Sequence, residues 1–136
     1  MKKQLAVLLS SGALLVTGLI AAPTASAATS CYAASCNGLN PANTICQNDA
    51  RTVSTGAFGS MELRYSPSCR AAWGRFVLNA PSGSRIEIKN DQGKKYTTSG
   101  SGKFFSVMVN DKDVTAWACG FWPRSDGENA ECSGGY

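Results

Sequence analysis

The 136-residue sequence contains no histidine. Serine and cysteine hydrolases that activate their nucleophile with an imidazole are therefore excluded, as are zinc sites with imidazole ligands. The sequence also has no G-x-S-x-G elbow, no S-x-x-K motif and no glycine-rich phosphate loop. Most small hydrolases depend on one of these features, so we expect neither enzymatic activity nor a cofactor.

Charged side chains are scarce as well, at 16% of the residues, with a formal net charge of +4. Two of the positive charges, Lys2 and Lys3, lie in an N-terminal segment that we expect to be removed. Their loss takes the net charge from +4 to +2. So small an excess of positive charge gives no indication of nucleic-acid binding.

The first 27 residues have the pattern of a secretory signal peptide. A positively charged start precedes an apolar run from Leu5 to Ile20, and the small residues Ala25-Ser26-Ala27 form an A-x-A cleavage site. We therefore expect a secreted protein, cleaved after about Ala27, in which residues 28–136 form a single exported domain. No later apolar run is long enough for a membrane span, and we expect a monomer.

Six cysteines lie beyond this segment, and an even number in an exported domain is typical of a disulfide framework. A metal site is disfavoured, because the sequence has no histidine and no C-x-x-C pair. The spacing favours one pairing, Cys119 with Cys132, whose closure should contribute about 3 kcal/mol. The pairing of the other four stays open. The six are Cys31, Cys36, Cys46, Cys69, Cys119 and Cys132.

From Arg51 onward the dominant pattern is the period-two alternation of half-buried strands. Met61, Leu63 and Tyr65 fall on one face of such a strand, for example, while the polar residues between them fall on the other. Frequent turn signals then predict an all-β fold, a small disulfide-stabilised sandwich or barrel of about six to eight strands. Residues 28–50 lack periodicity and are predicted to form a cystine-rich loop.

Three local predictions are more specific. Residues 66–73 could form one short helical turn after the Ser-Pro pair, and we expect no helix elsewhere. The turn signal at 81–83 predicts a hairpin between residues 76–78 and 86–88. The Ser-Gly-Ser-Gly stretch at 99–102 predicts a further turn.

The stretch from Glu62 to Trp73, ELRYSPSCRAAW, is too specific for strand chemistry alone to explain. Together with CNGLNP at 36–41 and with Cys46, it resembles a family of exported domains of unknown function from Gram-positive bacteria, chiefly actinobacteria. The resemblance extends from about Cys31 to Phe76. It implies a folded extracellular module and supplies neither a reaction nor catalytic residues.

Within this stretch, Trp73 is predicted to belong to the core, because an indole buries a large apolar area. Arg64 and Arg70 have two interpretations. They could pair with Glu62, another carboxylate or local carbonyl groups, or they could be presented to an anionic ligand. We favour the structural interpretation, because a fold-defining cystine and tryptophan lie close by in the sequence.

The aromatic residues of the last third are candidates for a ligand-binding surface. Trp117, Phe121, Trp122 and Tyr136 could form a stacking platform for sugar rings, or they could be the core of the last strand. Trp117 and Trp122 are five residues apart, so on one strand they should face opposite ways. We expect Trp122 to be the more exposed of the two.

Three functions are compatible with these observations. The first is a non-enzymatic module that binds an extracellular ligand, either a cell-wall glycan or a protein. The second is a proteinase inhibitor or toxin-like effector that presents a rigid loop at Ser125–Glu131. The third is a glycan hydrolase with two catalytic carboxylates. Its candidate pairs are Glu62 with Glu87 and Asp111 with Asp113, which are otherwise interpreted as strand and turn residues.

Overall fold

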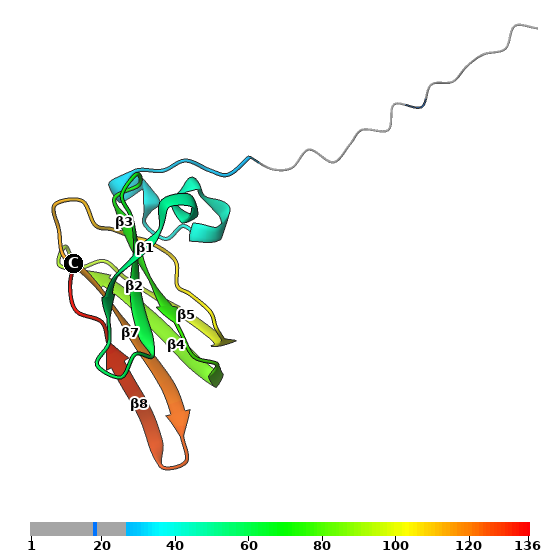
Figure 1. Cartoon of the computed structure of the whole chain (residues 1–136), viewed down its shortest axis with the longest axis vertical. Coiled ribbons are helices and arrows are strands. Elements are labelled where there is room, and N and C mark those ends of the chain that lie inside the picture. The colour runs from blue at the N-terminus through cyan, green and yellow to red at the C-terminus, as the bar shows by residue number, and fades with distance from the viewer. Residues whose placement is uncertain (1–17, 19–26) are drawn as a thin grey trace, which may run out of the picture.

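The computed structural model describes residue 18 and residues 27–136 (Figure 1), so the predicted signal peptide lies almost entirely outside the described residues. The described part forms three short 3-10 helices followed by eight strands. None of its helices has the length and apolar character needed to cross a membrane. The helices are η1 (Ala33–Cys36), η2 (Pro41–Asn43) and η3 (Ile45–Asp49). The strands are β1 (Arg51–Thr55), β2 (Met61–Ser66), β3 (Ala71–Phe76), β4 (Ala80–Asn90), β5 (Lys95–Gly102), β6 (Val109–Asn110), β7 (Ala116–Arg124) and β8 (Gly127–Cys132).

The strands form two antiparallel four-stranded sheets. The first sheet has the order β1-β2-β3-β6, and the second has the order β5-β4-β7-β8. Their inner faces pack together, as the alternation of apolar and polar residues along each strand requires. The all-β prediction is therefore confirmed, and the two open sheets make the fold a sandwich rather than a closed barrel.

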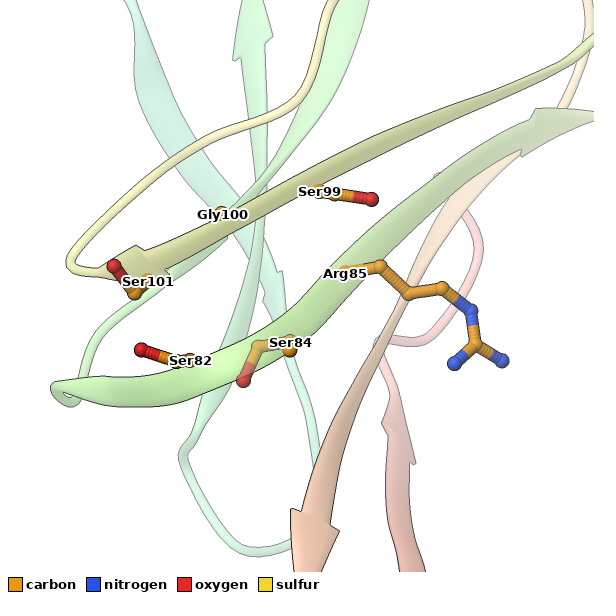
Figure 2. Close-up of a pocket in the computed structure, with 7 residues that line it drawn as sticks. Ser82, Ser84, Arg85, Ser99, Gly100 and Ser101 are labelled. Atoms are coloured by element: carbon orange, nitrogen blue, oxygen red, sulfur yellow. The ribbon is translucent and has the colours of Figure 1, made fainter.

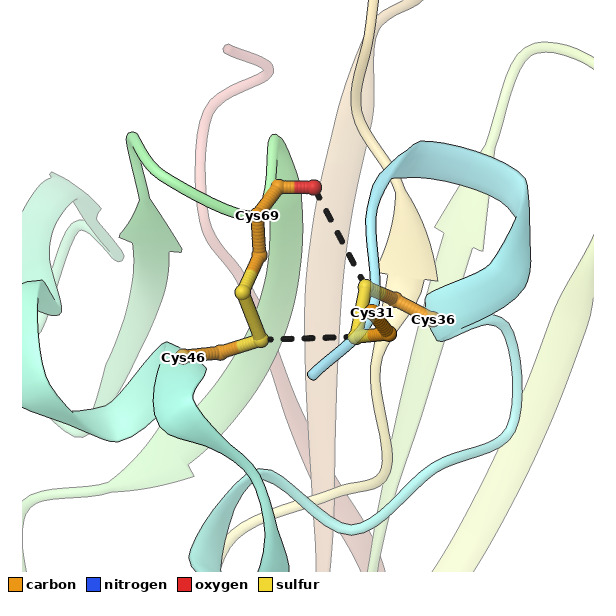
Figure 3. A group of neighbouring side chains, drawn as sticks. All are labelled: Cys31, Cys36, Cys46 and Cys69. Atoms are coloured by element: carbon orange, nitrogen blue, oxygen red, sulfur yellow. Dashed lines mark hydrogen bonds between the residues drawn. A yellow bond between two sulfur atoms is a disulfide. The ribbon is translucent and has the colours of Figure 1, made fainter. Parts of the chain in front are cut away.

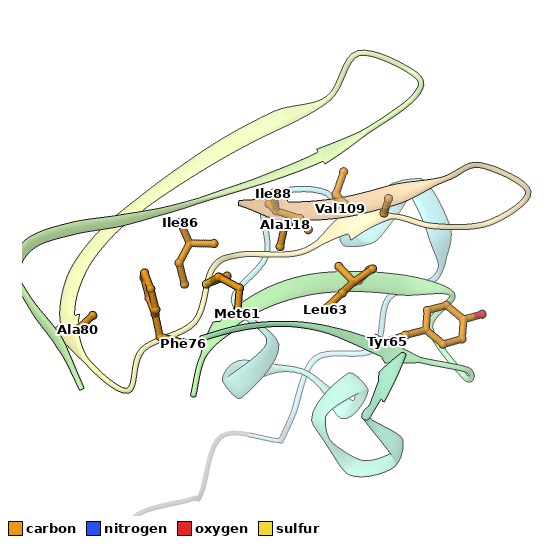
Figure 4. Close-up of a cluster of buried hydrophobic side chains, with 11 residues drawn as sticks. Met61, Leu63, Tyr65, Phe76, Ala80, Ile86, Ile88, Val109 and Ala118 are labelled. Carbon is orange, nitrogen blue, oxygen red and sulfur yellow. The ribbon is translucent and has the colours of Figure 1, made fainter. Parts of the chain in front are cut away.

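The sandwich core lies between the two sheets (Figure 4). Met61, Leu63 and Tyr65 of β2 face Ile86 and Ile88 of β4 across this space, in the alternation that the sequence predicts. The remaining members of the buried cluster are Ala72, Phe76, Ala80, Val109, Ala116 and Ala118.

Two glycines allow the sheets to approach closely. A Cβ atom at Gly74 in β3 would lie 2.7 Å from the Ala118 Cβ and from the Ile86 Cγ2. At Gly120 in β7 it would lie 2.5 Å from the Met61 Sδ. These distances are too short for real atoms, so the packing of the two sheets depends on the absence of a side chain at both positions.

The outer face of the first sheet is partly covered by a cap, which we define as residues 31–50. Two of its helices, η2 and η3, begin at side-chain caps: Asn40 accepts a hydrogen bond from the Ala42 amide and Thr44 accepts one from the Cys46 amide. A second apolar cluster lies beneath the cap. Its buried members are Cys36, Cys46, Cys69, Ala71, Trp73 and Met108.

Two disulfides hold the cap, one joining Cys31 to Cys36 and the other joining Cys46 to Cys69 in the β2–β3 turn (Figure 3). The Sγ atoms of Cys31 and Cys46 are only 3.4 Å apart. All four sulfurs lie within 4.8 Å of one another, which is compact enough for a four-thiolate metal site. In the structure they are bonded in pairs, and so do not present the thiolates that a metal requires.

The third disulfide joins Cys119 to Cys132, the one pairing that the sequence favoured. These two residues are directly opposite each other in the β7–β8 ladder. Their disulfide therefore crosses two strands that are already hydrogen-bonded, on the outer face of the second sheet. The hairpin extends beyond the rest of the sandwich in Figure 1.

The structure corrects the three local predictions. Residues 67–70 form the β2–β3 turn without a helix, and the short helices lie in the cap instead. The turn signal at 81–83 lies within β4, and β3 and β4 belong to different sheets, so they do not form a hairpin. Residues 99–102 continue β5, because the side chain of Phe104 occupies the space that Gly100 leaves open.

Two acidic side chains join separate parts of the chain. Glu131 is buried and accepts hydrogen bonds from the amides of Phe58 at 2.6 Å and Ser60 at 3.0 Å, which ties the β1–β2 loop to β8. Asp49 accepts hydrogen bonds from the Ser66 hydroxyl and the Ser68 amide, which ties η3 to the β2–β3 turn. Although burial opposes the shift, these bonds lower the pKa of Asp49.

Candidate ligand-binding groove

A groove of about 260 Å³ lies where the edge of the cap meets the outer face of the first sheet. Its sheet side comes from β2 and β3, and its other wall comes from η2 and η3. Phe105, which bridges to Arg75 beside β3, completes it. The lining residues are Pro41, Ala42, Gln47, Ala50, Arg64, Trp73, Arg75 and Phe105.

Strand periodicity brings the groove's polar residues together. The outward residues of β2 include Glu62 and Arg64, and those of β3 include Trp73 and Arg75. The ladder pairs Glu62 with Arg75 and Arg64 with Trp73. Cross-strand neighbours of this kind have Cβ atoms about 5 Å apart, so all four side chains share one small area.

Arg64 is half-buried and held in place by neighbouring groups. Its guanidinium donates hydrogen bonds to the Thr52 hydroxyl at 2.9 Å and to the Ala50 carbonyl at 3.1 Å. These contacts fit the structural interpretation of Arg64, which included local carbonyl groups as partners. The Thr52 hydroxyl is an additional partner that the sequence did not suggest. Burial and the nearby charge of Arg75 lower the pKa of Arg64, while Glu62 acts in the opposite direction.

Arg75 forms an ion pair with Glu62. Its Nε and one terminal nitrogen both donate to the Glu62 Oε2, at 3.1 Å and 2.6 Å. The side chain of Glu62 is 17% exposed and that of Arg75 is 40% exposed, so the pair lies at the surface of the groove. One terminal nitrogen of Arg75 has no partner among the described residues.

The groove continues past Arg75 into a second hollow of about 400 Å³. Arg75 and Phe105 line both hollows. The second hollow adds the exposed Lys103 together with Phe76 and Val77. The two hollows adjoin at these two shared residues, so together they extend from the cap to the end of β3.

Arg70, the other arginine considered in the sequence, lies away from the groove. It occupies the β2–β3 turn with a φ of 47° and pairs with Asp113 at 3.1 Å. The Asp113 side chain is 75% exposed, so this is a surface ion pair. The structural interpretation therefore fits Arg70 better than a role in ligand binding.

The two tryptophans of β7 face opposite ways, as the strand period requires, and both are half-buried. Trp122 is directed toward the sandwich core, where it packs edge-on against Phe76 at a centroid distance of 5.9 Å. Trp117 is half-buried on the outer face of the second sheet. The sequence could not assign the two faces, because both sides of β7 carry large residues near the hairpin.

The outer face of the second sheet is flat and its charges are paired. Arg85 contacts Glu128 at 2.5 Å and lies over the Phe121 ring, 4.0 Å from its centroid. Glu87 contacts Lys89 and Lys95 at 3.3 Å and 3.4 Å. Trp117 and Phe121 flank the cystine on this face, but none of the hollows described here includes either side chain.

A further hollow, of about 370 Å³, opens where β4 and β5 separate (Figure 2). Serine hydroxyls from both strands surround it, while the side chain of Arg85 points away from them toward Glu128. Arg85 is the one charged residue in its lining, and its guanidinium is engaged with Glu128. The serines are Ser82, Ser84, Ser99 and Ser101.

The carboxylate pairs considered for glycan hydrolysis do not converge. Glu62 lies on the outer face of the first sheet and Glu87 on that of the second, so the sandwich separates them. Asp111 is buried, and neither of its carboxylate oxygens has a hydrogen-bond partner among the described residues, whereas Asp113 is exposed. Burial raises the pKa of Asp111 to about 7.

Sequence reasoning missed Arg75, Lys103 and Phe105. Arg75 could have been found, because it lies two residues after Trp73 and so shares its face of the strand. Phe105 follows a stretch that was interpreted as a turn, and its neighbour Phe104 faces the core instead. The sequence shows that one of the two phenylalanines faces outward but does not show which.

A family model described as "Protein of unknown function (DUF2690)" matches residues 34–119. The matched segment contains every residue that lines the groove. No curated protein and no solved structure matches the chain.

Proposed function

The chain belongs to this family of unknown function, and on that premise we propose that it is a secreted, non-enzymatic module that binds a cell-envelope component in the groove. The signal-peptide pattern of residues 1–27 supports secretion. The disulfides support it too, since such bonds persist in oxidising compartments.

The observation that carries the proposal is the position of the groove. Arg64 and Trp73 belong to the stretch by which the sequence resembles the family, and they line the same hollow. Structural needs alone account for Trp73, which is 4% exposed. The stability of the fold does not explain why Arg75, a second arginine with a 40% exposed side chain, lies beside Trp73 in the same groove. Concave surfaces with a few convergent polar groups are where small ligands bind.

The projecting β7–β8 hairpin favours a second candidate, the inhibitor or effector. The disulfide at its base makes the hairpin rigid, and its tip is exposed. However, the ladder uses the backbone of most of this segment, and Arg124 at the tip is paired with Asp126. Few groups are left free to engage a protease, so we place this candidate second.

A glycan hydrolase is the least supported candidate. The one carboxylate beside the groove, Glu62, is paired with Arg75, and its suggested partner Glu87 lies on the other side of the molecule. Hydrolysis by the two-carboxylate mechanism needs both acids on either side of one glycosidic bond, about 5 to 10 Å apart.

The proposal is tested by co-sedimentation of the purified residues 28–136 with envelope material. The insoluble ligands are peptidoglycan sacculi carrying their attached polymers, with cellulose and chitin for comparison. We expect retention on the envelope material and a loss of retention for Trp73→Phe combined with Phe105→Ala, which changes the groove while keeping an aromatic ring in the core. The matched control, Trp117→Ala, alters the opposite face and should be retained normally. Retention that depends on Trp117 and not on the groove would overturn the proposal.

A further inference from the structure

We infer that the groove binds a carboxylate-bearing glycan, with an acid group of the glycan on Arg75 and its sugar rings along Phe105. This inference rests on the proposed function and adds the chemical class of the ligand. It follows from three features of the groove: its charge, its ion pair and its elongated shape.

The first feature is an excess of positive charge. Among the residues that line the two hollows and their direct partners, Arg64, Arg75 and Lys103 are cationic, and only Glu62 is anionic. Elsewhere on the sandwich, Arg70, Arg85 and Arg124 are each matched by a carboxylate, from Asp113, Glu128 and Asp126, whereas Arg51 contacts Tyr136 and the Tyr65 ring. The whole protein has a modest charge, so this excess is a local property of the groove.

The unmatched charge has a physical effect on the groove itself. Burial and the proximity of Arg75 both lower the pKa of Arg64, so its charged form is less favourable there than in water. An anion placed between the two guanidinium groups would relieve this repulsion. A neutral ligand would leave it unchanged, and a cationic ligand would increase it.

The second feature is the Arg75–Glu62 pair, in which the protein's own carboxylate occupies the position of a ligand. Arg75 donates twice to one oxygen of Glu62 and keeps one terminal nitrogen free. Both of these charge-assisted hydrogen bonds converge on a single carboxylate oxygen, so the guanidinium already binds an acid group at this point. Glu62 therefore acts as an internal competitor for an acidic ligand.

The third feature is length. The hollows of about 260 Å³ and 400 Å³ meet at Arg75 and Phe105, so the cations are distributed along two adjoining hollows rather than gathered at one point. A compact anion placed between Arg64 and Arg75 would occupy the first hollow only, whereas Lys103 lines the second. A polymer with an acid group on successive sugars can contact several, and the phenyl ring of Phe105 offers an apolar surface for the C–H face of a sugar.

The test compares two polymers that differ only in charge, polygalacturonate and its methyl-esterified form. Binding of each to the folded domain is measured by affinity electrophoresis at low and high salt. We expect retardation by the acidic polymer that weakens with added salt, and at least tenfold weaker binding of the ester. Equal binding of both polymers would overturn this inference while leaving the proposed binding function intact. If the domain binds neither polymer and does not bind sacculi either, both this inference and the proposed binding function are overturned.

Two variants make the test specific to the groove. Arg75→Gln should weaken binding of the acidic polymer about tenfold, because it removes a charge-assisted contact. Glu62→Gln should strengthen the same binding several-fold, since it removes the internal competitor. A merely structural Arg75–Glu62 pair would not produce a gain. Loss of binding in Glu62→Gln, with the melting temperature unchanged, would therefore contradict the inference.

A matched control and an alternative anion complete the design. Arg85→Gln removes an arginine of the same charge from the opposite face, and should leave binding within twofold of the unsubstituted protein. A glycerol-phosphate polymer of matched charge density distinguishes carboxylate from phosphate. Tighter binding of the phosphate polymer would overturn the assignment to a carboxylate.

Discussion

The two outer faces of the sandwich are stabilised in different ways. The face of the first sheet is covered by a cap that contains no strands and is held by two disulfides over a buried cluster. The face of the second sheet is open, and its one disulfide joins residues that the ladder already pairs. The comparison indicates that a cystine matters most where few backbone hydrogen bonds hold the chain. The groove lies on the first of these faces, where two disulfides hold the cap.

The largest effect should come from removing the Cys46–Cys69 disulfide. Cys46→Ala with Cys69→Ala should lower the free energy of unfolding by about 3 to 5 kcal/mol, because it opens a loop and empties part of a buried cluster. Cys119→Ala with Cys132→Ala should lower it less, to the extent that the β7–β8 ladder persists. Thermal unfolding of both variants under oxidising conditions measures the difference. Equal losses would break the comparison.

Replacement of the tryptophans should show the same difference between the two faces. Trp73→Ala removes a side chain that is 4% exposed beneath the cap, and should destabilise the protein by about 3 to 5 kcal/mol. Trp117→Ala on the open face should destabilise it by about 1 kcal/mol. Urea titration followed by circular dichroism gives both values. A Trp117 variant as unstable as the Trp73 variant would show that the second face is not open in solution.

The two sides of the molecule should also respond to pH with opposite signs. Burial raises the pKa of Asp111 from 3.8 to about 7, with Asp91 adding to the shift and Arg70 opposing it. The folded protein then holds a proton that the unfolded chain releases, so this group lowers stability as the pH rises from about 4 to about 7. Asp111→Asn should therefore raise the melting temperature at pH 8 and have little effect at pH 4. A melting temperature that falls at pH 8 would show that the charged carboxylate has a partner.

Glu87 on the second face should behave in the opposite way. Burial alone would raise its pKa, but the ion pairs with Lys89 and Lys95 lower the pKa overall. Its stabilising contribution is present above the ordinary pKa of a glutamate and is lost as the pH falls through the lowered value. Glu87→Gln should thus reduce the melting temperature at pH 7 more than at pH 3, as a pH series of thermal scans would show. The same reduction at both pH values would contradict the sign.

The smallest effect should come from the exposed Arg85–Glu128 pair. Such pairs contribute about 0.2 to 1 kcal/mol, and salt screens them. A double-mutant cycle with Arg85→Gln and Glu128→Gln should give a coupling energy in that range at low salt. A much larger value would show that the open face is more strongly organised by its charges than we infer.

The alternation in β2 predicted the core side of that strand correctly, because the period of a strand determines which side chains share a face. The same pattern could not predict which strands are neighbours. Phe76 and Ile86 face one core from opposite sheets, and a hairpin would have given an identical alternation. The chain leaves the first sheet after β3 and enters the second sheet at Ala80. This change of sheet depends on tertiary packing and leaves no mark on the alternation of residues.

The groove was harder to predict than the fold for a related reason. Arg64 and Trp73 could be singled out in the sequence, but the wall that makes their surface concave comes from Pro41 and Ala42 in the cap. The position of the cap depends on the Cys46–Cys69 pairing, one of several that the sequence left open. Without that pairing, the concavity could not be inferred from the residues.

The close approach at Gly74 and Gly120 has a consequence for how relatives of this protein can vary. Met61 contacts the space above both glycines, with its Cε 3.3 Å from a Cβ at Gly74 and its Sδ 2.5 Å from one at Gly120. A larger residue at Gly120 would collide first with Met61 and then with Phe76, so it requires a smaller residue at 61, whereas at Gly74 the closest atoms belong to Ala118 and Ile86. Across an alignment of the family, residues 61 and 120 should therefore covary in size. Covariation of this kind would show, from sequences alone, that the distance between the two sheets is the same across the family.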